Sequence, residues 1–117
     1  MDKEMNKKEI AKKVIELCNK YKTLIENLST SQFQNLRYLG KRTQIIDEIK
    51  IYLEYQATRM QLKAEEKEKK ELKSELKKFL GEINEIINNF KENPEDLKYF
   101  IGNLVRYATS IIKSKEG

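Results

Sequence analysis

The side chains that carry out most enzyme chemistry are scarce in this 117-residue chain. It contains no histidine, so the usual proton-transfer group near neutral pH and the commonest metal ligand are both missing. Its single cysteine, Cys18, falls on an apolar helical stripe and cannot build a zinc site by itself. The four glycines form no cluster of the kind that cradles a nucleotide phosphate. We therefore predict that the chain is not an enzyme and holds no cofactor or metal ion.

Adjacent carboxylates are the other candidates for chemistry. They occur as three pairs: Asp47–Glu48, Glu65–Glu66 and Glu95–Asp96. A metal-dependent nuclease needs carboxylates that converge on one cation, whereas neighbouring residues on a helix point about 100° apart. The third pair follows Pro94 in the first turn of a predicted helix, where negative charge complements the helix dipole. A structural role is favoured for all three pairs.

Side chains that could bind a polyanion are more abundant. Arginine and lysine neutralise phosphates, tyrosine stacks on bases or ribose, and amides bond to phosphate or 2′-hydroxyl oxygens. Each of the four arginines lies near a tyrosine or glutamine at helical spacing. We predict an RNA-binding surface made of Gln34, Arg37, Tyr38, Lys41, Arg42, Tyr55, Arg59 and Arg106. An ordinary solvated face with local ion pairs is the alternative interpretation.

The elements that must position these groups are helices, because apolar residues recur every three to four positions and no strand pattern occurs. The spacing predicts helices over residues 7–28, 30–40, 42–62, 70–91 and 94–114. The chain is thus predicted to be all-α, a compact bundle of about five helices forming one domain over residues 1–117.

Several local signals set the predicted helix boundaries. Asn6 is a plausible cap for the first helix, and Ser29 with Gln32 has the form of a capping box for the second. Gly40 is predicted to stop the second helix, and Pro94 to open the last one. Gln56 falls within an apolar stripe and is expected to be a hydrogen-bonded buried amide.

The segment after the third predicted helix is almost wholly charged. Continuing the apolar phase of that helix would bury Lys67 and Glu71, which is unfavourable. We therefore expect a bend, a break or a solvated helical arm near residues 62–70.

The charge balance gives 24 Lys and Arg against 19 Asp and Glu, for a net charge of +5. This moderate excess is consistent with a polyanionic partner. No stretch is apolar enough to span a bilayer, and the first residues lack the apolar core of a secretory signal. We expect a cytoplasmic protein that interacts with no membrane and no small-molecule substrate.

Three short stretches together resemble the small helical subunit of type III-A CRISPR effector (Csm) complexes. They are Leu28–Leu36 (LSTSQFQNL), Tyr55–Arg59 (YQATR) and Phe100–Tyr107 (FIGNLVRY). They are similar to the family's Thr-Ser-x-hydrophobic-Arg-Asn-Leu, Tyr-Gln-Ala-Gly-Arg and aromatic-x-Glu-Ala-Leu-Val-Ala-Tyr elements. Their order and spacing also fit, so the resemblance spans most of residues 28–112.

The chain departs from the family pattern at four positions. Gln34 stands where the family usually has arginine, and Arg37, one turn on, is a candidate substitute. Thr58 replaces a glycine, Gly102 replaces a glutamate and Arg106 replaces an alanine.

The resemblance implies a non-catalytic subunit whose copies line up head to tail as an inner filament. The filament runs beside the guide RNA–target RNA duplex, and its basic residues contact the RNA backbone. The implied partners are guide RNA and target RNA, copies of the chain itself, and the backbone and large subunits of the complex.

Two other functions remain open. The chain could be a helical adaptor or a self-associating bundle that binds only protein. It could also bind DNA through a helix-turn-helix around Ser29–Gly40, although the apolar Phe33 just after the cap disfavours a reading helix there.

Overall fold

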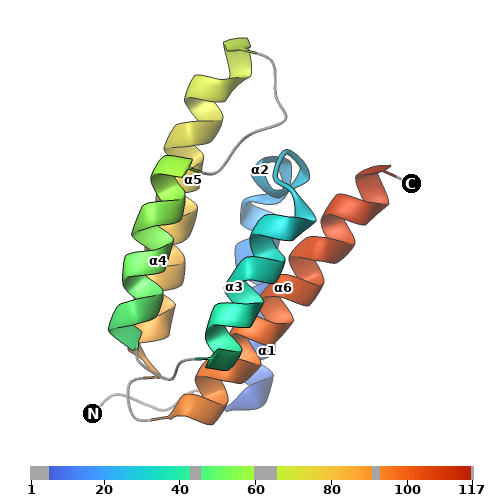
Figure 1. Ribbon diagram of the computed structural model, residues 1–117. Helices are drawn as coiled ribbons and strands as arrows, with labels where there is room; N and C mark the ends of the chain where they lie inside the picture. The colour runs from blue at the N-terminus through green and yellow to red at the C-terminus, as the bar shows by residue number, and fades with distance from the viewer. Residues whose placement is uncertain (1–5, 43–45, 60–65, 91–92, 117) are drawn as a thin grey trace.

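Six α-helices make up nearly all of the residues described by this computed structural model, which are 6–42, 46–59, 66–90 and 93–116 (Figure 1). The helices are α1 (Lys7–Lys20), α2 (Lys22–Glu26), α3 (Thr30–Arg42), α4 (Ile46–Arg59), α5 (Glu66–Asn88) and α6 (Pro94–Glu116). The described residues contain no strand, so the all-α prediction is confirmed. There is one helix more than the five predicted, and none of the helices described is long and apolar enough to cross a bilayer.

The additional helix arises because the predicted helix 7–28 divides at Tyr21. This residue has φ −111° and ψ 27°, and its ring is buried against Phe79 at a centroid distance of 5.2 Å. The apolar stripe continues through the division, with Leu24 and Ile25 of α2 fully buried. Periodicity therefore identified the buried face correctly but could not reveal the break, because no glycine or proline marks it.

Helix starts follow the predicted capping groups. The Asn6 side chain accepts a hydrogen bond from the Glu9 backbone N–H at 2.9 Å. At the start of α3, the Ser29 backbone N–H donates to the Gln32 side-chain oxygen at 2.9 Å, which is the amide half of a capping box. Helix α6 begins at Pro94, as predicted.

Gly40 does not stop a helix, contrary to the prediction. Helix α3 continues through it to Arg42, and no described glycine has a positive φ. Gly40 is buried against α6, where an added Cβ would lie 3.1 Å from Ile101 Cδ1 and 3.2 Å from Ile101 Cγ2. The glycine therefore allows α3 and α6 to approach closely.

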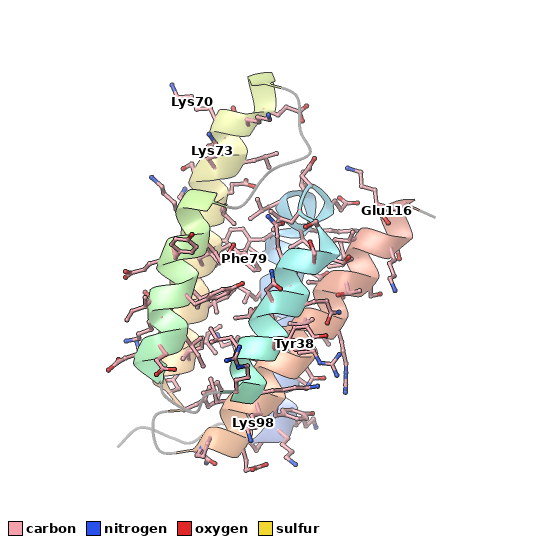
Figure 2. All side chains as sticks on the ribbon, in the orientation of Figure 1. Tyr38, Lys70, Lys73, Phe79, Lys98 and Glu116 are labelled. Carbon is pink, nitrogen blue, oxygen red and sulfur yellow. The ribbon has the colours of Figure 1, made fainter. Side chains whose placement is uncertain are left out.

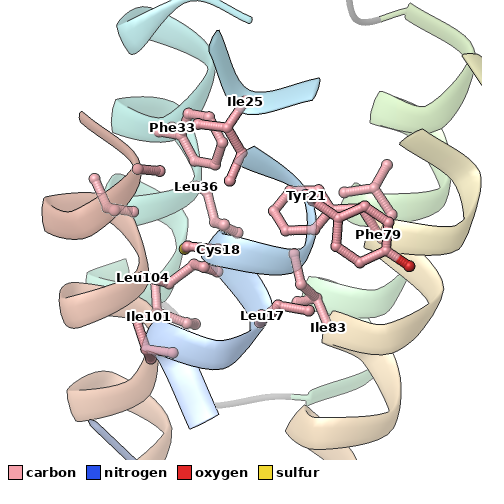
Figure 3. Packing of buried hydrophobic residues seen from close by; sticks show 14 of the residues in the cluster. Leu17, Cys18, Tyr21, Ile25, Phe33, Leu36, Phe79, Ile83, Ile101 and Leu104 are labelled. Carbon is pink, nitrogen blue, oxygen red and sulfur yellow. The ribbon is translucent and has the colours of Figure 1, made fainter. Parts of the chain in front are cut away.

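Helices α1, α2 and α3 all pack on α6 (Figures 1 and 3). The apolar residues of α6 recur at helical spacing and are buried at eight positions: Leu97, Phe100, Ile101, Leu104, Val105, Ala108, Ile111 and Ile112. Three aromatic contacts extend the core, because Phe79 lies against Tyr21 and, at 6.5 Å, against Phe33, while Phe90 lies 5.8 Å from Phe100.

Helices α4 and α5 form an antiparallel hairpin beside this bundle (Figure 1). They are two separate helices, and Ile49 and Leu53 on the apolar stripe of α4 are buried. A bend, a break or a solvated helical arm was expected near residues 62–70; of these, 62–65 lie outside the described part of the chain, and α5 begins at Glu66. Ile45 and Met60, which continue the apolar stripe of α4, also lie outside the described part. Gln56, predicted to be a buried amide, is half-buried. The hairpin joins the bundle mainly through α5, whose Phe79 and Ile83 face Leu17 and Tyr21 (Figure 3).

Candidate nucleic-acid interface

A basic groove runs between α3 and α6. Helix α3 contributes Arg37 and Lys41, one turn apart, and α6 contributes Lys98 and Arg106, two turns apart. The hollow between them measures about 220 Å³ and is lined by Arg37, Gly40, Lys41, Lys98, Ile101, Gly102 and Arg106. We call it the α3–α6 groove.

Two glycines shape the α3–α6 groove. Gly40 brings the two helices together against Ile101, so side chains of both reach the same hollow. Gly102 lies on α6 midway between Lys98 and Arg106, and a Cβ there would meet nothing within 4 Å. The lack of a side chain at Gly102 leaves open space between the two cations.

Among the described residues that line the groove, four are positively charged and none is a carboxylate. In the part of the chain that the structure describes, none of these four cations forms an ion pair. Gathering like charges destabilises a fold through their mutual repulsion, and an anion in the hollow would relieve it. The arrangement suits a phosphate, to which arginine and lysine donate charge-assisted hydrogen bonds.

Tyr38 and Gln34 flank the groove on α3 without lining it. Tyr38 is 63% exposed, and Gln34 is half-buried. Tyr38 and Lys98 both lie toward the end of the bundle where α3 finishes and α6 begins (Figure 2). An exposed tyrosine beside cations can stack on a ribose or a base of a bound nucleic acid.

The structure therefore separates the eight predicted site residues. Arg37, Lys41 and Arg106 line one groove, whereas Arg42 is exposed at the end of α3 and does not line it. Tyr55 lies on α4 and is 51% exposed, so it belongs to a different surface. Arg59 is the last residue of α4, and its side chain lies outside the described part.

Lys98 was missed from the sequence, although a signal for it was present. Lys98, Gly102 and Arg106 follow one another at four-residue spacing and so share one face of α6. The neighbouring Tyr99 faces α1 instead, where Lys7 Nζ lies 5.5 Å from its ring centroid. Choosing between these two faces required knowing that α3 packs on α6.

Two other hollows differ in character from the basic one. The α1–α6 groove, about 270 Å³, is largely apolar and includes Ile15 and Tyr107, with Arg106 at the edge that it shares with the α3–α6 groove. The hollow between α1 and α5, about 280 Å³, mixes lysines with glutamates. There Lys20 Nζ donates to Glu82 Oε1 at 2.7 Å.

The titratable groups in the core show no sign of activation. Burial raises the pKa of the Cys18 thiol to about 12, so it stays protonated and unreactive in the folded chain. The pKa of Tyr21 is raised to about 12, chiefly by burial and to a smaller extent by the nearby Glu82 carboxylate. Among the described residues, no three His, Cys, Asp or Glu side chains are grouped closely enough to hold a metal ion.

A comparison of the chain with protein-family models, with curated proteins and with solved structures found no match.

Proposed function

We propose that this chain is a non-catalytic, cytoplasmic small subunit of a type III-A CRISPR (Csm) complex. In this role it holds the backbone of the guide RNA–target RNA duplex in the α3–α6 groove without reading the sequence. Other subunits of the complex, including its backbone and large subunits and further copies of this chain, are the protein partners.

The proposal is carried by the convergence on one hollow of four cations that form no ion pair within the described part of the chain. A cluster of like charges without a carboxylate costs stability, which is understandable if an anion occupies the site. Contacts to phosphate supply affinity but no base readout, so binding is expected to be independent of sequence. The three sequence stretches similar to the Csm small subunit supply the biological setting.

The first test measures RNA affinity after removing two groove charges. Arg37→Gln with Lys98→Gln should weaken binding to an RNA duplex of arbitrary sequence by about tenfold per substitution, because each removes a charge-assisted contact. The slope of log affinity against log salt should fall by about 0.9 for each lost phosphate contact on a duplex. Fluorescence anisotropy over a salt series measures both quantities.

A matched control removes two lysines elsewhere. Lys70 and Lys73 are exposed near the start of α5, and neither lines the α3–α6 groove (Figure 2). Lys70→Gln with Lys73→Gln lowers the net charge by the same amount and should leave the affinity nearly unchanged. Equal losses in the two double variants would show that net charge, and not the groove, governs binding. Equal wild-type affinity at about 50 and 300 mM salt would contradict backbone binding altogether.

Gly102 offers a second test with the charge as the only variable. Gly102→Glu and Gly102→Gln add side chains of similar size and helix propensity into open space. The glutamate places a carboxylate between Lys98 and Arg106, so it should lower RNA affinity, whereas the glutamine should lower it much less. If both variants bind alike, the groove does not hold phosphate.

The setting in a CRISPR complex is tested separately. A tagged chain expressed in its native host should copurify with guide RNA and with the other subunits of an effector complex. Copurification of protein partners that survives nuclease treatment, with no guide RNA in the untreated sample, would favour the adaptor alternative.

A further inference from the structure

The two grooves that α6 borders meet at one side chain. Helix α6 packs on both α1 and α3, and each groove follows one of these contacts. Arg106 lines both grooves. Helical spacing places Gly102 of the α3–α6 groove about 40° to one side of Arg106 and Ser110 of the α1–α6 groove about 40° to the other. One ligand can therefore occupy both grooves at once.

The α1–α6 groove is lined mainly by apolar side chains. Helix α1 contributes Ala11, Val14 and Ile15, of which Ile15 is 45% exposed. Helix α6 contributes Tyr107, whose hydroxyl donates to Asn19 Oδ1 of α1 at 3.3 Å and so holds the ring in place. The exposed isoleucine and the half-buried tyrosine leave apolar surface that a ligand would remove from water.

Two polar side chains of α6, Asn103 and Ser110, lie among these apolar ones. Asn103 Nδ2 donates to the Tyr99 carbonyl oxygen at 2.8 Å, so its Oδ1 is the atom that it can offer to a ligand. The exposed Ser110 hydroxyl can donate or accept a hydrogen bond. A group with flat, stacking faces and a hydrogen-bonding edge suits this lining, and a nucleobase has both.

The shared arginine favours a nucleotide over other apolar ligands. A peptide side chain or a lipid tail would fit the apolar lining but would bring no phosphate to the four cations of the adjoining groove. A nucleotide carries its base and its phosphate in one unit, so the charge of Arg106 and the apolar lining are both used. The base must be unpaired, because pairing and stacking within a duplex occupy its edge and its faces.

We propose that the α1–α6 groove takes an unpaired nucleobase of the RNA whose backbone lies in the α3–α6 groove, with Arg106 bound to the phosphate of that nucleotide. The base lies against Ile15 and the Tyr107 ring, and Asn103 or Ser110 bonds to its edge. This inference rests on the proposed function and deepens it, because the chain then prefers RNA with an unpaired nucleotide. Every base can stack, so the preference concerns RNA structure and not sequence.

Three RNA duplexes of one sequence separate the base from the backbone. The first is fully paired, the second has one bulged uridine, and the third has a bulged abasic residue in the same place. The two bulged duplexes carry the same phosphates, so the difference between them reports the base. We expect the uridine bulge to bind about tenfold more tightly than the abasic bulge, because stacking of one base contributes roughly that much. Fluorescence anisotropy at a fixed salt concentration measures this ratio.

Ser110→Leu fills the α1–α6 groove without changing the charge. Ser110 is exposed, so the fold should persist, and circular dichroism checks this. The variant should bind the two bulged duplexes equally, because the base can no longer enter. Ser74→Leu makes the same substitution at an exposed position on α5 and should keep the tenfold preference.

A second variant tests the apolar wall without filling the groove. Ile15→Gln replaces the exposed apolar side chain by a polar one and should lose most of the preference for the uridine bulge. Ile51→Gln is its matched control, because Ile51 is 67% exposed on α4 and lines neither groove. It should bind all three duplexes like the wild type.

Uridine monophosphate provides a further competitor, since it carries the same base, ribose and phosphate without the chain. It engages only one phosphate, so we expect it to displace the bulged duplex only at far higher concentrations than RNA itself. Competition at equal concentrations would assign the groove to free nucleotides and overturn the RNA occupant.

Equal wild-type binding of the two bulged duplexes would overturn the nucleobase site, as would a folded Ser110→Leu variant that keeps the full preference. In both cases, a fully paired duplex whose affinity still depends on Arg37 and Lys98 would leave the proposed function standing. A chain that binds none of the three duplexes would overturn the proposed function and this inference together.

Discussion

The α3–α6 pair and the α4–α5 hairpin are built from similar amphipathic helices, but the groove of the first and the outer face of α4 in the second present opposite charges to solvent. Where α3 meets α6, four cations converge on a hollow that has no carboxylate among its described lining residues. On the outer face of α4, the exposed carboxylates of Asp47, Glu48 and Glu54 share one face of the helix with the exposed Ile51. The net charge of +5 describes neither surface. What a charged chain offers to partners depends on which helices pack together and how closely.

The two regions also differ in how they are held. Helix α3 packs closely on α6 at Gly40, which lies against the Ile101 side chain, and this contact fixes the α3–α6 groove. The hairpin reaches the bundle mainly through α5, at the aromatic cluster around Phe79 and at the Lys20–Glu82 ion pair. We therefore expect the groove to be the more rigid region and the hairpin the more readily detached one.

The largest effect is expected at Phe79, where the two regions join. Phe79→Ala should lower the free energy of unfolding by about 3–5 kcal/mol, because a fully buried ring in contact with Tyr21 and Phe33 is lost. Urea denaturation measures the change. Hydrogen exchange should show the greatest loss of protection in α4 and α5.

Phe100→Ala is the matched variant within the bundle, since Phe100 is also fully buried and contacts Phe90. Phe100→Ala should lower the free energy of unfolding by a similar amount. It should, however, reduce hydrogen-exchange protection in α1, α3 and α6 as well as in α4 and α5. If both variants lowered protection in the same pattern, the hairpin would not be a separately detachable region.

A smaller loss of stability is expected from a substitution where α3 packs on α6. Gly40→Ala adds a methyl group 3.1 Å from the Ile101 side chain, which is itself buried and cannot move aside freely. We expect a loss of about 1–3 kcal/mol in the free energy of unfolding from this overpacking. RNA affinity should fall too, because separating the helices pulls Arg37 away from Lys98.

Gly81 supplies the control for this substitution. It lies in α5 with nothing within 4 Å of an added Cβ, so Gly81→Ala should stabilise the chain by about 0.5–1 kcal/mol. If Gly40→Ala were also stabilising, the close approach of the two helices would not depend on the glycine.

The contrast between these two glycines shows what the sequence could and could not predict. Apolar spacing alone identified nearly all buried positions of α1, α5 and α6, because a 3.6-residue period depends only on the order of residues. The role of Gly40 depends on Ile101, more than 60 residues away along the chain. Gly40 was therefore predicted as a helix stop, which is wrong, and the break at Tyr21 was missed for the same reason.

The candidate site likewise has one part that the sequence could predict and another that it could not. Arginine, lysine and tyrosine on polar faces were recognisable as anion-binding types before any helix was placed. Only the packing of α3 on α6 groups Arg37 with Arg106 and adds Lys98, whereas Tyr55 lies apart from them on α4. The type of each residue can be read directly from the sequence, whereas a site between two helices depends on how those helices pack.

The smallest effect is expected at the ion pair between hairpin and bundle. Burial alone would raise the pKa of Glu82, but its interactions hold that pKa below the ordinary value of 4.5. The interactions that lower it are hydrogen bonds from Lys20 and from the Tyr21 hydroxyl, and the positive charges of Lys20 and Lys13. A carboxyl with a lowered pKa in the folded state adds stability above its unfolded pKa. That contribution is lost as the pH falls through the folded pKa.

Glu82→Gln should therefore cost at most about 1 kcal/mol at neutral pH, since both partners are partly exposed and solvent screens the pair. The difference between wild type and variant should shrink as the pH falls below 4.5, because the wild-type carboxyl then becomes protonated and neutral like the amide. Urea denaturation over a pH series measures this difference, and the same series on Lys20→Gln tests whether Lys20 is the partner. A stability difference that stayed constant down to about pH 3 would mean that Glu82 supports the hairpin through packing and not through its charge.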